Sequence, residues 1–283
     1  MKTAFVFAGG GSLGAVQVGM LKAVSEAGIF ADMLVGASVG AINAGFFASD
    51  PTDKGALRLE NIWKGIKRSD VFQVASITGL LGLFSLREYI CSPKPLRHLI
   101  ESNVNRKLLE DLQLPCHIVA TDLFTGIEVS LSRGSIVSAL LAASAIPTVF
   151  PPVKIGSHYL VDGSVTNNTP ISVAVAKGAD RILVFPTGMS CALKRPPKRL
   201  IEMAMQTLNL ATSQRLVVDI ENYSRNYEII VLPPLCPLDV SIFNFSRTSE
   251  LIERAESNTH RWISEGGLDG QTDAIAALRP HYH

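Results

Sequence analysis

Two glycine-rich turns constrain the fold of this chain more than any other feature of its sequence. The first, residues 9–14, connects an apolar run rich in Phe and Val at 3–8 to a helical pattern at 15–28. The second connects an apolar run at 33–36 to a helical pattern of small and apolar residues at 39–48. A strand, a turn, a helix and a second strand in this order predict a β-α-β unit with parallel strands.

The rest of the chain continues to alternate between strand and helix patterns. Strands are predicted at 116–120, at 127–131, at 181–185, and as a pair at 154–161 that turns at Gly156-Ser157. Helices are predicted at 53–67, 95–103, 136–145 and 170–177. The pattern favours an α/β fold with a central, mostly parallel sheet flanked by helices.

Residues 191–199 mark the expected boundary between a core at 1–190 and a C-terminal extension at 191–283. The boundary segment combines Pro196-Pro197 with four basic residues. We expect the extension to pack on the core, so that the chain forms one compact domain. Its predicted elements are a helix at 200–223, a strand at 227–232 and a helix at 249–263.

The charge, cysteine and histidine patterns exclude several classes of function. Lys and Arg number 26 against 25 Asp and Glu, and no long basic run is present, so no nucleic-acid partner is expected. The four cysteines are widely spaced, and no histidines apart from the terminal His281 and His283 have metal-ligand spacing. Neither a metal site nor a disulfide framework is therefore expected.

These patterns also bear on location. The apolar run at 4–8 is too short for the apolar region of a signal peptide, and the cysteine pattern fits a reducing compartment. We expect a cytoplasmic protein that acts on a small or lipid-like substrate and makes peripheral, transient contact with membranes or lipid aggregates. The oligomeric state stays open.

The second turn carries a candidate nucleophile. Gly36-Ala37-Ser38-Val39-Gly40 is a Gly-x-Ser-x-Gly motif between a predicted strand and a predicted helix, which is the setting of a nucleophile elbow. Glycine on both sides of Ser38 allows the sharp turn and directs the serine oxygen outward. Alone, the motif is equally consistent with a small-residue turn that packs a helix on a sheet.

The first turn is a candidate anion site. Its glycines expose successive backbone N–H groups at the start of a helix, where an oxyanion or a phosphate is stabilised. Read as Gly9-x-Gly11-x-x-Gly14, it also matches a dinucleotide-binding fingerprint, the basis of an alternative oxidoreductase hypothesis. That hypothesis requires an acidic residue at the end of the second strand. Ser38 lies there, whereas Glu26 and Asp32 precede the strand, so the alternative is disfavoured.

A third polar site follows the strand pair at 154–161. Asp162-Gly163-Ser164 begins a predicted polar loop that leads through Asn167 and Asn168 into the helix at Pro170. A carboxylate at a strand end, followed by glycine, can closely approach the turn of a neighbouring strand. Taken alone, Asp162 is a turn residue that caps the loop.

Together, the glycine loop, the serine turn and the later Asp-Gly resemble the patatin-like phospholipase family in order and placement. The resemblance extends over residues 3–185. Further matching stretches are Ala120-Thr121-Asp122, residues 143–147, Pro151-Pro152-Val153, Asn168 and Pro170. The resemblance implies a three-layer α/β/α fold and a lipid ester hydrolase, such as a phospholipase A, a lysophospholipase or an esterase.

The resemblance also implies a mechanism without histidine, metal or organic cofactor. Ser38 would attack the ester carbonyl, and Asp162 would accept the serine proton. Backbone N–H groups of the glycine loop would stabilise the oxyanion. The implied oxyanion hole comprises Gly9, Gly10, Gly11 and Ser12, and the supporting motif residues are Gly14, Gly36, Gly40 and Gly163.

Two positions depart from the family pattern. Leu13 stands where the family often has a basic residue, which weakens the expectation of a preference for phospholipid head groups. Ser164 replaces a glycine or an alanine after Asp162-Gly163, a small change that should preserve the loop. A Ser-His-Asp triad with His260 is an alternative mechanism, because His260 follows the acid in chain order. A lipid-binding scaffold without catalysis is another alternative.

The uncharged segment 71–86 contains several large apolar side chains. This is too much apolar surface for an ordinary exposed loop. Two interpretations stay open: the segment belongs to the core, or part of it lines an acyl channel and acts as a lid.

Overall fold

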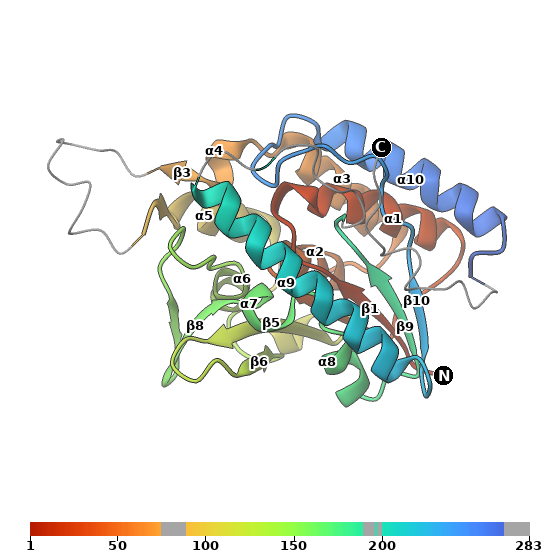
Figure 1. The fold of residues 1–283 in the computed structure, drawn as a ribbon, viewed down its shortest axis with the longest axis horizontal. Helices are drawn as coiled ribbons and strands as arrows, with labels where there is room; N and C mark the ends of the chain where they lie inside the picture. Colours follow the sequence, from red (N-terminus) through yellow and green to blue (C-terminus); the bar gives the residue numbers. More distant parts are fainter. Residues whose placement is uncertain (75–88, 189–195, 197–199, 269–283) are drawn as a thin grey trace, which may run out of the picture.

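The protein is described by a computed structural model that covers residues 1–74, 89–188, 196 and 200–268 (Figure 1). In this part of the chain an eight-stranded sheet has the order β10-β9-β1-β2-β5-β8-β7, with β6 paired to β5. The strands are β1 (Thr3–Phe7), β2 (Met33–Ala37), β5 (Cys116–Asp122), β6 (Glu128–Leu131), β7 (Val153–Ile155), β8 (His158–Asp162), β9 (Arg181–Phe185) and β10 (Glu228–Val231). Strands β10, β9, β1, β2 and β5 pair in parallel, and β6, β7 and β8 pair antiparallel, which confirms the predicted mostly parallel sheet.

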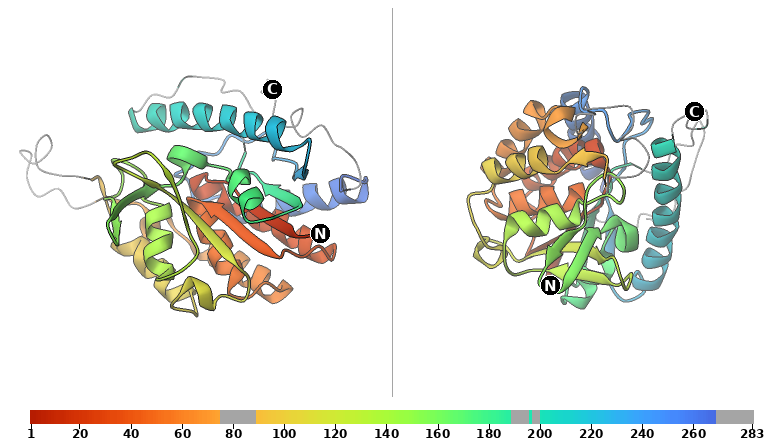
Figure 2. Two further views of the ribbon diagram at one scale, coloured as in Figure 1. Left: turned by 90° about the horizontal axis from the view of Figure 1, so that it is seen from below. Right: turned by 90° about the vertical axis from the view of Figure 1, so that its left-hand side faces the viewer.

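Helices cover both faces of the sheet and give three layers (Figure 2). One layer contains α1 (Gly14–Glu26), α2 (Val39–Ala48), α3 (Asp53–Gly65), α5 (Lys94–Asn103), α6 (Ile136–Ala143) and α10 (Thr248–Ser264). The other contains α7 (Ser164–Asn167), α8 (Ile171–Ala176) and α9 (Leu200–Tyr223). The short elements α4 (Arg68–Val71), β3 (Gln73–Val74) and β4 (Cys91–Ser92) lie beside α5 and outside the main sheet.

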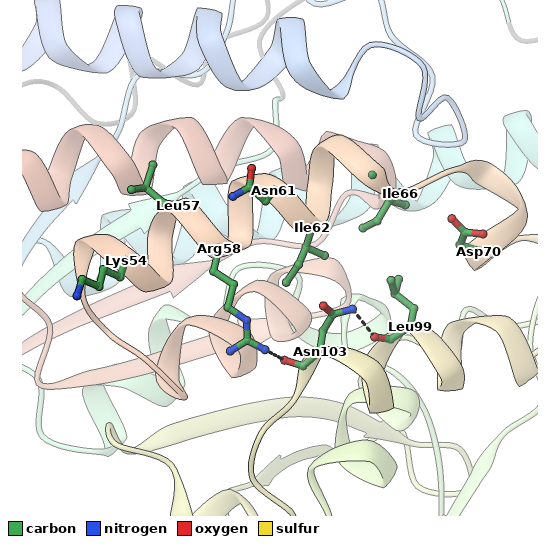
Figure 3. Close-up of a pocket in the computed structure, with 10 residues that line it drawn as sticks. Lys54, Leu57, Arg58, Asn61, Ile62, Ile66, Asp70, Leu99 and Asn103 are labelled. Atoms are coloured by element: carbon green, nitrogen blue, oxygen red, sulfur yellow. Dashed lines mark hydrogen bonds between the residues drawn. The ribbon is translucent and has the colours of Figure 1, made fainter.

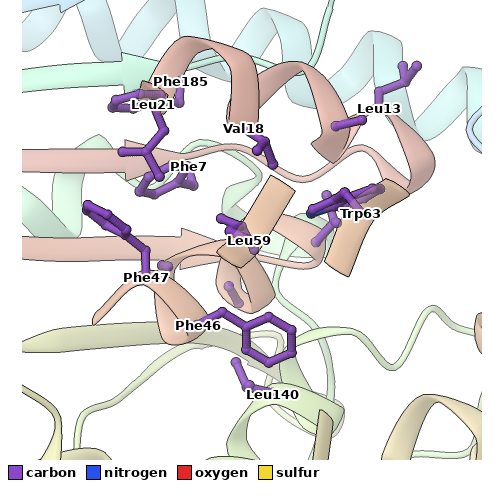
Figure 4. Packing of buried hydrophobic residues seen from close by; sticks show 14 of the residues in the cluster. Phe7, Leu13, Val18, Leu21, Phe46, Phe47, Leu59, Trp63, Leu140 and Phe185 are labelled. Carbon is purple, nitrogen blue, oxygen red and sulfur yellow. The ribbon is translucent and has the colours of Figure 1, made fainter. Parts of the chain in front are cut away.

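The apolar run of β1 shows why the sheet is covered on both sides. Phe5 and Phe7 belong to the cluster beneath α1, α2 and α3, and Phe7 stacks on Phe185 (Figure 4). Ala4 and Val6 point the opposite way, into the cluster beneath α8 and α9. A strand buried on both faces reads as a continuous apolar run rather than an alternating one.

Strand β5 carries two strands end to end on one of its edges. Strand β6 pairs with residues 118–121 of β5, β2 pairs as far as Val119, and β8 starts at Ala120. Because β6 overlaps both ranges, it occupies one edge alone, and β2 and β8 share the other. The carboxyl ends of β2 and β8 therefore meet, since Ala37 lies opposite Val119 and Asp162 lies opposite Ala120.

The longer predicted elements agree closely with the observed ones, whereas the short elements α4, β3, β4 and α7 were not predicted. Residues 164–167, expected in a polar loop, form the single turn α7. The helix predicted to run to residue 67 ends at Gly65.

Even the 24-residue α9 lacks an apolar stretch suited to crossing a bilayer, and the same holds for the other described helices.

The C-terminal extension contributes to both the sheet and a helical layer. Strand β10 adds to the edge next to β9, and α10 packs along α1. Gly19 allows this close packing, because a Cβ at that position would overlap the carbonyl oxygen of Ile252. The boundary predicted at 191–199 lies outside the described residues except for Pro196, and the division into core and extension stays a prediction.

Replacement of Leu251 tests whether the extension folds with the core. Leu251 is fully buried on α10. If the chain is one cooperative unit, Leu251→Ala should lower the free energy of unfolding by about 2–5 kcal/mol in a single urea transition. The matched control is Leu210→Ala on α9, where the leucine is 58% exposed and a change within about 0.5 kcal/mol is expected. Two separate transitions, with Leu251→Ala shifting only one, would contradict a single domain.

Candidate active site

Ser38 lies in the turn between β2 and α2 with a strained backbone. Its φ is 52° and its ψ is −129°, a positive φ that is uncommon for a residue with a side chain. The turn leaves no room for other side chains nearby: a Cβ at Gly40 would overlap the carbonyl oxygens of Phe7 and Ala8, and one at Gly36 would overlap the backbone of Gly40. The two motif glycines are thus required by close backbone contact, as expected of a nucleophile elbow.

Asp162 ends β8 and faces Ser38. The Ser38 hydroxyl donates to Asp162 Oδ2 at 2.8 Å, and the Ser164 N–H donates to Oδ1 at 2.8 Å. Each carboxylate oxygen therefore accepts at least one hydrogen bond, which fixes the orientation of the carboxylate. Asp162 is 2% exposed, and this burial raises its pKa to about 6, although the hydrogen bonds from Ser164 and Ser38 offset part of the increase.

The carboxyl end of α6 holds the two residues together. The carbonyl oxygen of Ala143 accepts hydrogen bonds from the N–H of Ser38 at 3.1 Å and from the N–H of Gly163 at 3.3 Å. The carbonyl oxygen of Ala145 accepts from the N–H of Asp162 at 3.0 Å. The stretch 143–147, noted in the sequence only as part of the family resemblance, thus has a structural role at the site.

The glycine loop passes directly beside Ser38, but only part of it is available to an anion. The Gly9 N–H donates to the carbonyl of Asn168 at 3.0 Å, and the Ser12 N–H donates to the carbonyl of Ile242 at 2.8 Å. The expectation that Gly9 and Ser12 belong to the oxyanion hole is corrected accordingly, because both N–H groups are already bonded. Among the described residues, the N–H groups of Gly10 and Gly11 have no protein acceptor.

A buried polar network that the sequence analysis did not identify supports this loop. Gln17 Nε2 donates to the carbonyl oxygens of Ala8 at 2.7 Å and Phe185 at 2.9 Å. Asn43 Nδ2 donates to Gln17 Oε1 at 2.8 Å, and Trp63 Nε1 donates to Asn43 Oδ1 at 2.8 Å. The signal in the sequence was a single polar residue, Gln17, in the otherwise apolar first two turns of α1, and a single polar residue, Asn43, in the otherwise apolar α2.

Ser38 opens onto a pocket with nearly all-apolar walls. They come from α2, α3, α5 and the segment before β7, and include Ile42, Phe46, Trp63, Ile66, Leu96 and Phe150. The cavity measures about 50 Å³, which is small beside the roughly 300–1,000 Å³ of typical ligand sites. A long ligand would therefore have to displace some of these side chains.

The start of the apolar segment 71–86 contributes to the same pocket. Val71 and Phe72 line it, and Phe72 packs on the rings of Phe150 and Phe243. Residues 75–86, which carry most of the lid hypothesis, lie outside the described residues.

Among the described residues, no histidine hydrogen-bonds to Ser38 or Asp162, and none lines their pocket. His260, the candidate for a triad, is on the outer surface of α10, where its Nε2 lies 2.9 Å from Glu26 Oε2. His158 bonds Asp122 at 2.7 Å. The triad with His260 is therefore wrong, because its imidazole is bonded elsewhere.

One cluster of potential metal ligands occurs among the described residues. Glu26, Glu256 and His260 place their ligand atoms within 4.8 Å of one another. However, the Lys22 ammonium lies 2.7 Å from Glu256 and 2.9 Å from Glu60. The positive charge beside these carboxylates is thus already supplied by Lys22, at the contact between α1 and α10.

Replacement of Asp162 tests whether burial of its carboxylate raises its pKa, because a raised pKa makes the free energy of unfolding depend on pH. Below about pH 4 the carboxyl is protonated in both states, whereas above pH 6 the folded protein holds a charge that burial disfavours. The free energy of unfolding should therefore fall as pH rises through this window. By about pH 8, Asp162→Asn should be more stable than the wild type by up to about 3 kcal/mol, and equally stable near pH 4.

Urea unfolding at both pH values measures this difference. Ser38→Ala is the control, because it leaves the carboxylate buried and should retain the decline. An Asp162→Asn advantage that does not grow with pH would contradict the raised pKa.

Comparison with known sequences places these features in a family. The model of the patatin-like phospholipase family matches residues 5–175. Neuropathy target esterase sws of Drosophila melanogaster is 29% identical over 187 residues, which are 65% of this chain and 13% of that protein. Patatin-like phospholipase domain-containing protein 7 of Rattus norvegicus is 29% identical over 189 residues, again 65% of this chain and 13% of that protein. The chain thus spans only a small part of these relatives' length.

Solved structures show the same fold. VipD from Legionella pneumophila matches with a TM-score of 0.52 and 15% identity, covering 100% of this chain and 71% of that one. Human GIVD cytosolic phospholipase A2, in complex with methyl gamma-linolenyl fluorophosphonate, matches with a TM-score of 0.52 and 14% identity, covering 98% of this chain and 59% of that one. With a family match over more than half of its length, and with the serine turn, the glycine loop and Asp162 inside the matched region, the chain belongs to the patatin-like phospholipase family.

Proposed function

We propose that this protein is a serine acyl-hydrolase that cleaves carboxylic ester bonds of lipids. The observation that carries the proposal is the 2.8 Å hydrogen bond from Ser38 Oγ to Asp162 Oδ2, with Ser38 in the wall of an apolar pocket. The hydroxyl is paired with a base and lies where an acyl chain would place its carbonyl carbon.

The reaction follows in two halves. Ser38 Oγ attacks the ester carbonyl carbon while Asp162 takes the hydroxyl proton, and the negative charge passes to the carbonyl oxygen. Collapse of this intermediate breaks the bond to the alcohol, which leaves with the proton from Asp162. Asp162 then takes a proton from water while the oxygen of that water attacks the acyl-serine carbonyl. Collapse of the second intermediate breaks the bond to Ser38 Oγ, which takes the proton back from Asp162, and the fatty acid is released.

The environment of Asp162 supports its role as base. A carboxylate with the usual pKa of about 4 is a weak base at neutral pH. The pKa of about 6 brings Asp162 closer to the optimum for proton transfer while leaving it mostly ionised at pH 7. The bond from the Ser164 N–H holds the carboxylate in place without an intervening imidazole.

The free N–H groups of the glycine loop support the assignment of the oxyanion hole. Gly11 lines the same pocket as Ser38, and the N–H groups of Gly10 and Gly11 lack protein acceptors in the described chain. Donors that already face the site need no reorganisation when charge develops, and each is worth about 10²–10³ in turnover in comparable sites.

The apolar walls favour a lipid acyl group over a polar substrate. The names of two relatives, neuropathy target esterase and patatin-like phospholipase domain-containing protein 7, support ester and lipid chemistry. Leu13 is buried and supplies no charge for a phosphate, so the acyl group rather than the head group is proposed as the main determinant of binding. A cytoplasmic location and contact with lipid aggregates stay predictions.

Replacement of the dyad residues tests the proposal. Ser38→Ala should lower turnover of p-nitrophenyl butyrate by about 10⁴ or more, and Asp162→Asn should have a similar effect, because each removes one member of a cooperating pair. A fluorophosphonate should label the wild type once, at Ser38, as measured by mass spectrometry. His158→Gln and His260→Gln are controls that should retain most turnover. Labelling at another serine, or a folded histidine variant as inactive as Ser38→Ala, would refute the dyad.

Replacement of Gly11 tests the oxyanion hole. Gly11 has a φ of 58°, and a Cβ there would press on the carbonyl oxygen of Ile242, so Gly11→Ala should displace the loop donors. We expect kcat to fall by up to about 10²–10³ with little change in KM. Gly28→Ala is the matched control, because Gly28 has a φ of 74° but open space around it. If kcat falls equally in both variants, or in neither, the donors lie elsewhere.

A further inference from the structure

A second cavity lies on the outer surface, between α3 and α5. It is an open groove of about 620 Å³ (Figure 3). Lys54, Arg58 and Ile62, spaced four residues apart on α3, form one wall and span about 12 Å of helix. Leu99 and Asn103 of α5 form the opposite wall, and the guanidinium of Arg58 donates to the carbonyl oxygen of Asn103 across the groove.

The groove and the pocket at Ser38 are separated by a thin apolar wall. Among the described residues, Ile62, Ile66 and Leu99 line both cavities. Ile62 and Leu99 are half-buried, and Ile66 is buried. These three aliphatic side chains are therefore the shared boundary of the two spaces, and aliphatic side chains can change rotamer.

The inner pocket leads from Ser38 toward this wall. Val39, Ile42 and Phe46 lie on one face of α2 and line the pocket, so it follows the helix for about 12 Å from the serine. Ile62, Ile66 and Leu99 belong to the walls of the same pocket. An extended chain that starts at Ser38 and fills this pocket thus contacts side chains that also border the groove.

We propose, on the basis of the ester hydrolase function proposed above, that a long acyl chain passes from the inner pocket between Ile62, Ile66 and Leu99 into the outer groove. The three side chains then act as a gate that sets the preference for acyl-chain length. The inner cavity of about 50 Å³ is too small to hold a long chain alone, whereas the groove of about 620 Å³ supplies the missing space.

The chemistry of the gate favours an acyl tail over a charged head group as the occupant. A phosphate that entered the groove through the gate would lose its hydration against aliphatic side chains, at a large desolvation penalty. An acyl chain gains from the same contacts, because each methylene leaves water. The aliphatic stems of Lys54 and Arg58 can cover the chain while their charged ends stay in solvent.

The gate is tested with p-nitrophenyl esters of increasing chain length. Leu99→Trp and Ile62→Trp should close the gate, so that kcat/KM for the palmitate ester falls by about tenfold or more relative to that for the butyrate ester. Leu99→Ala should shift the preference toward longer chains. Leu210→Trp on α9 is the matched control and should leave the whole series unchanged, since Leu210 is exposed on the other face of the sheet.

Equal loss with both esters in the two gate variants, or no loss with either, would overturn the gate. A wild type that hydrolyses neither ester would instead refute the proposed function. The gate is then judged by binding alone, using palmitate with a diazirine at its terminal carbon and Ser38→Ala protein. Crosslinks to residues 54–61 of α3 that disappear in Leu99→Trp support the gate. Crosslinks only at other elements, or crosslinks unchanged by Leu99→Trp, overturn it.

Discussion

The shared edge of β5 is the constraint on which the rest of the structure depends. Because β2 and β8 meet there end to end, residues 124 positions apart come within a 2.8 Å hydrogen bond, from Ser38 to Asp162. The carbonyl oxygens of Ala143 and Ala145 then fix the two backbones from the α6 side. A slip of β8 by one residue would turn the aspartate to the opposite face of the sheet. The pairing register of β8 on β5 therefore determines whether Asp162 can reach Ser38.

The site combines two states that are unfavourable in isolation. Ser38 has a positive φ, a conformation that costs about 1–3 kcal/mol, and Asp162 is a buried carboxylate with a raised pKa. Neither would persist without the packed layers and the backbone hydrogen bonds around them. The strain that exposes a hydroxyl and the burial that strengthens a base are both features that a protein selected for stability alone would lose.

The sequence predicted the parts of this arrangement that depend on local chemistry. The serine turn, its flanking glycines and the strand end at Asp162 follow from backbone sterics and apolar patterning within a few residues. Which N–H groups of the glycine loop remain free could not be predicted, because those of Gly9 and Ser12 are bonded to carbonyls more than 150 residues away in the chain. The inward-facing roles of Gln17 and Asn43 escaped prediction for the same reason, since their partners belong to other elements.

The order of the elements along the chain allows the pocket wall to change in evolution independently of the strands that hold Ser38 and Asp162. The frame that holds Ser38 and Asp162 is built by β2, β5, α6 and β8, whereas most of the pocket wall comes from the stretch between β2 and β5. Insertions, deletions and substitutions in that stretch can reshape the cavity without altering the pairing on β5. Descendants of one ancestor can therefore diverge in the molecules they accept while keeping a single chemical step.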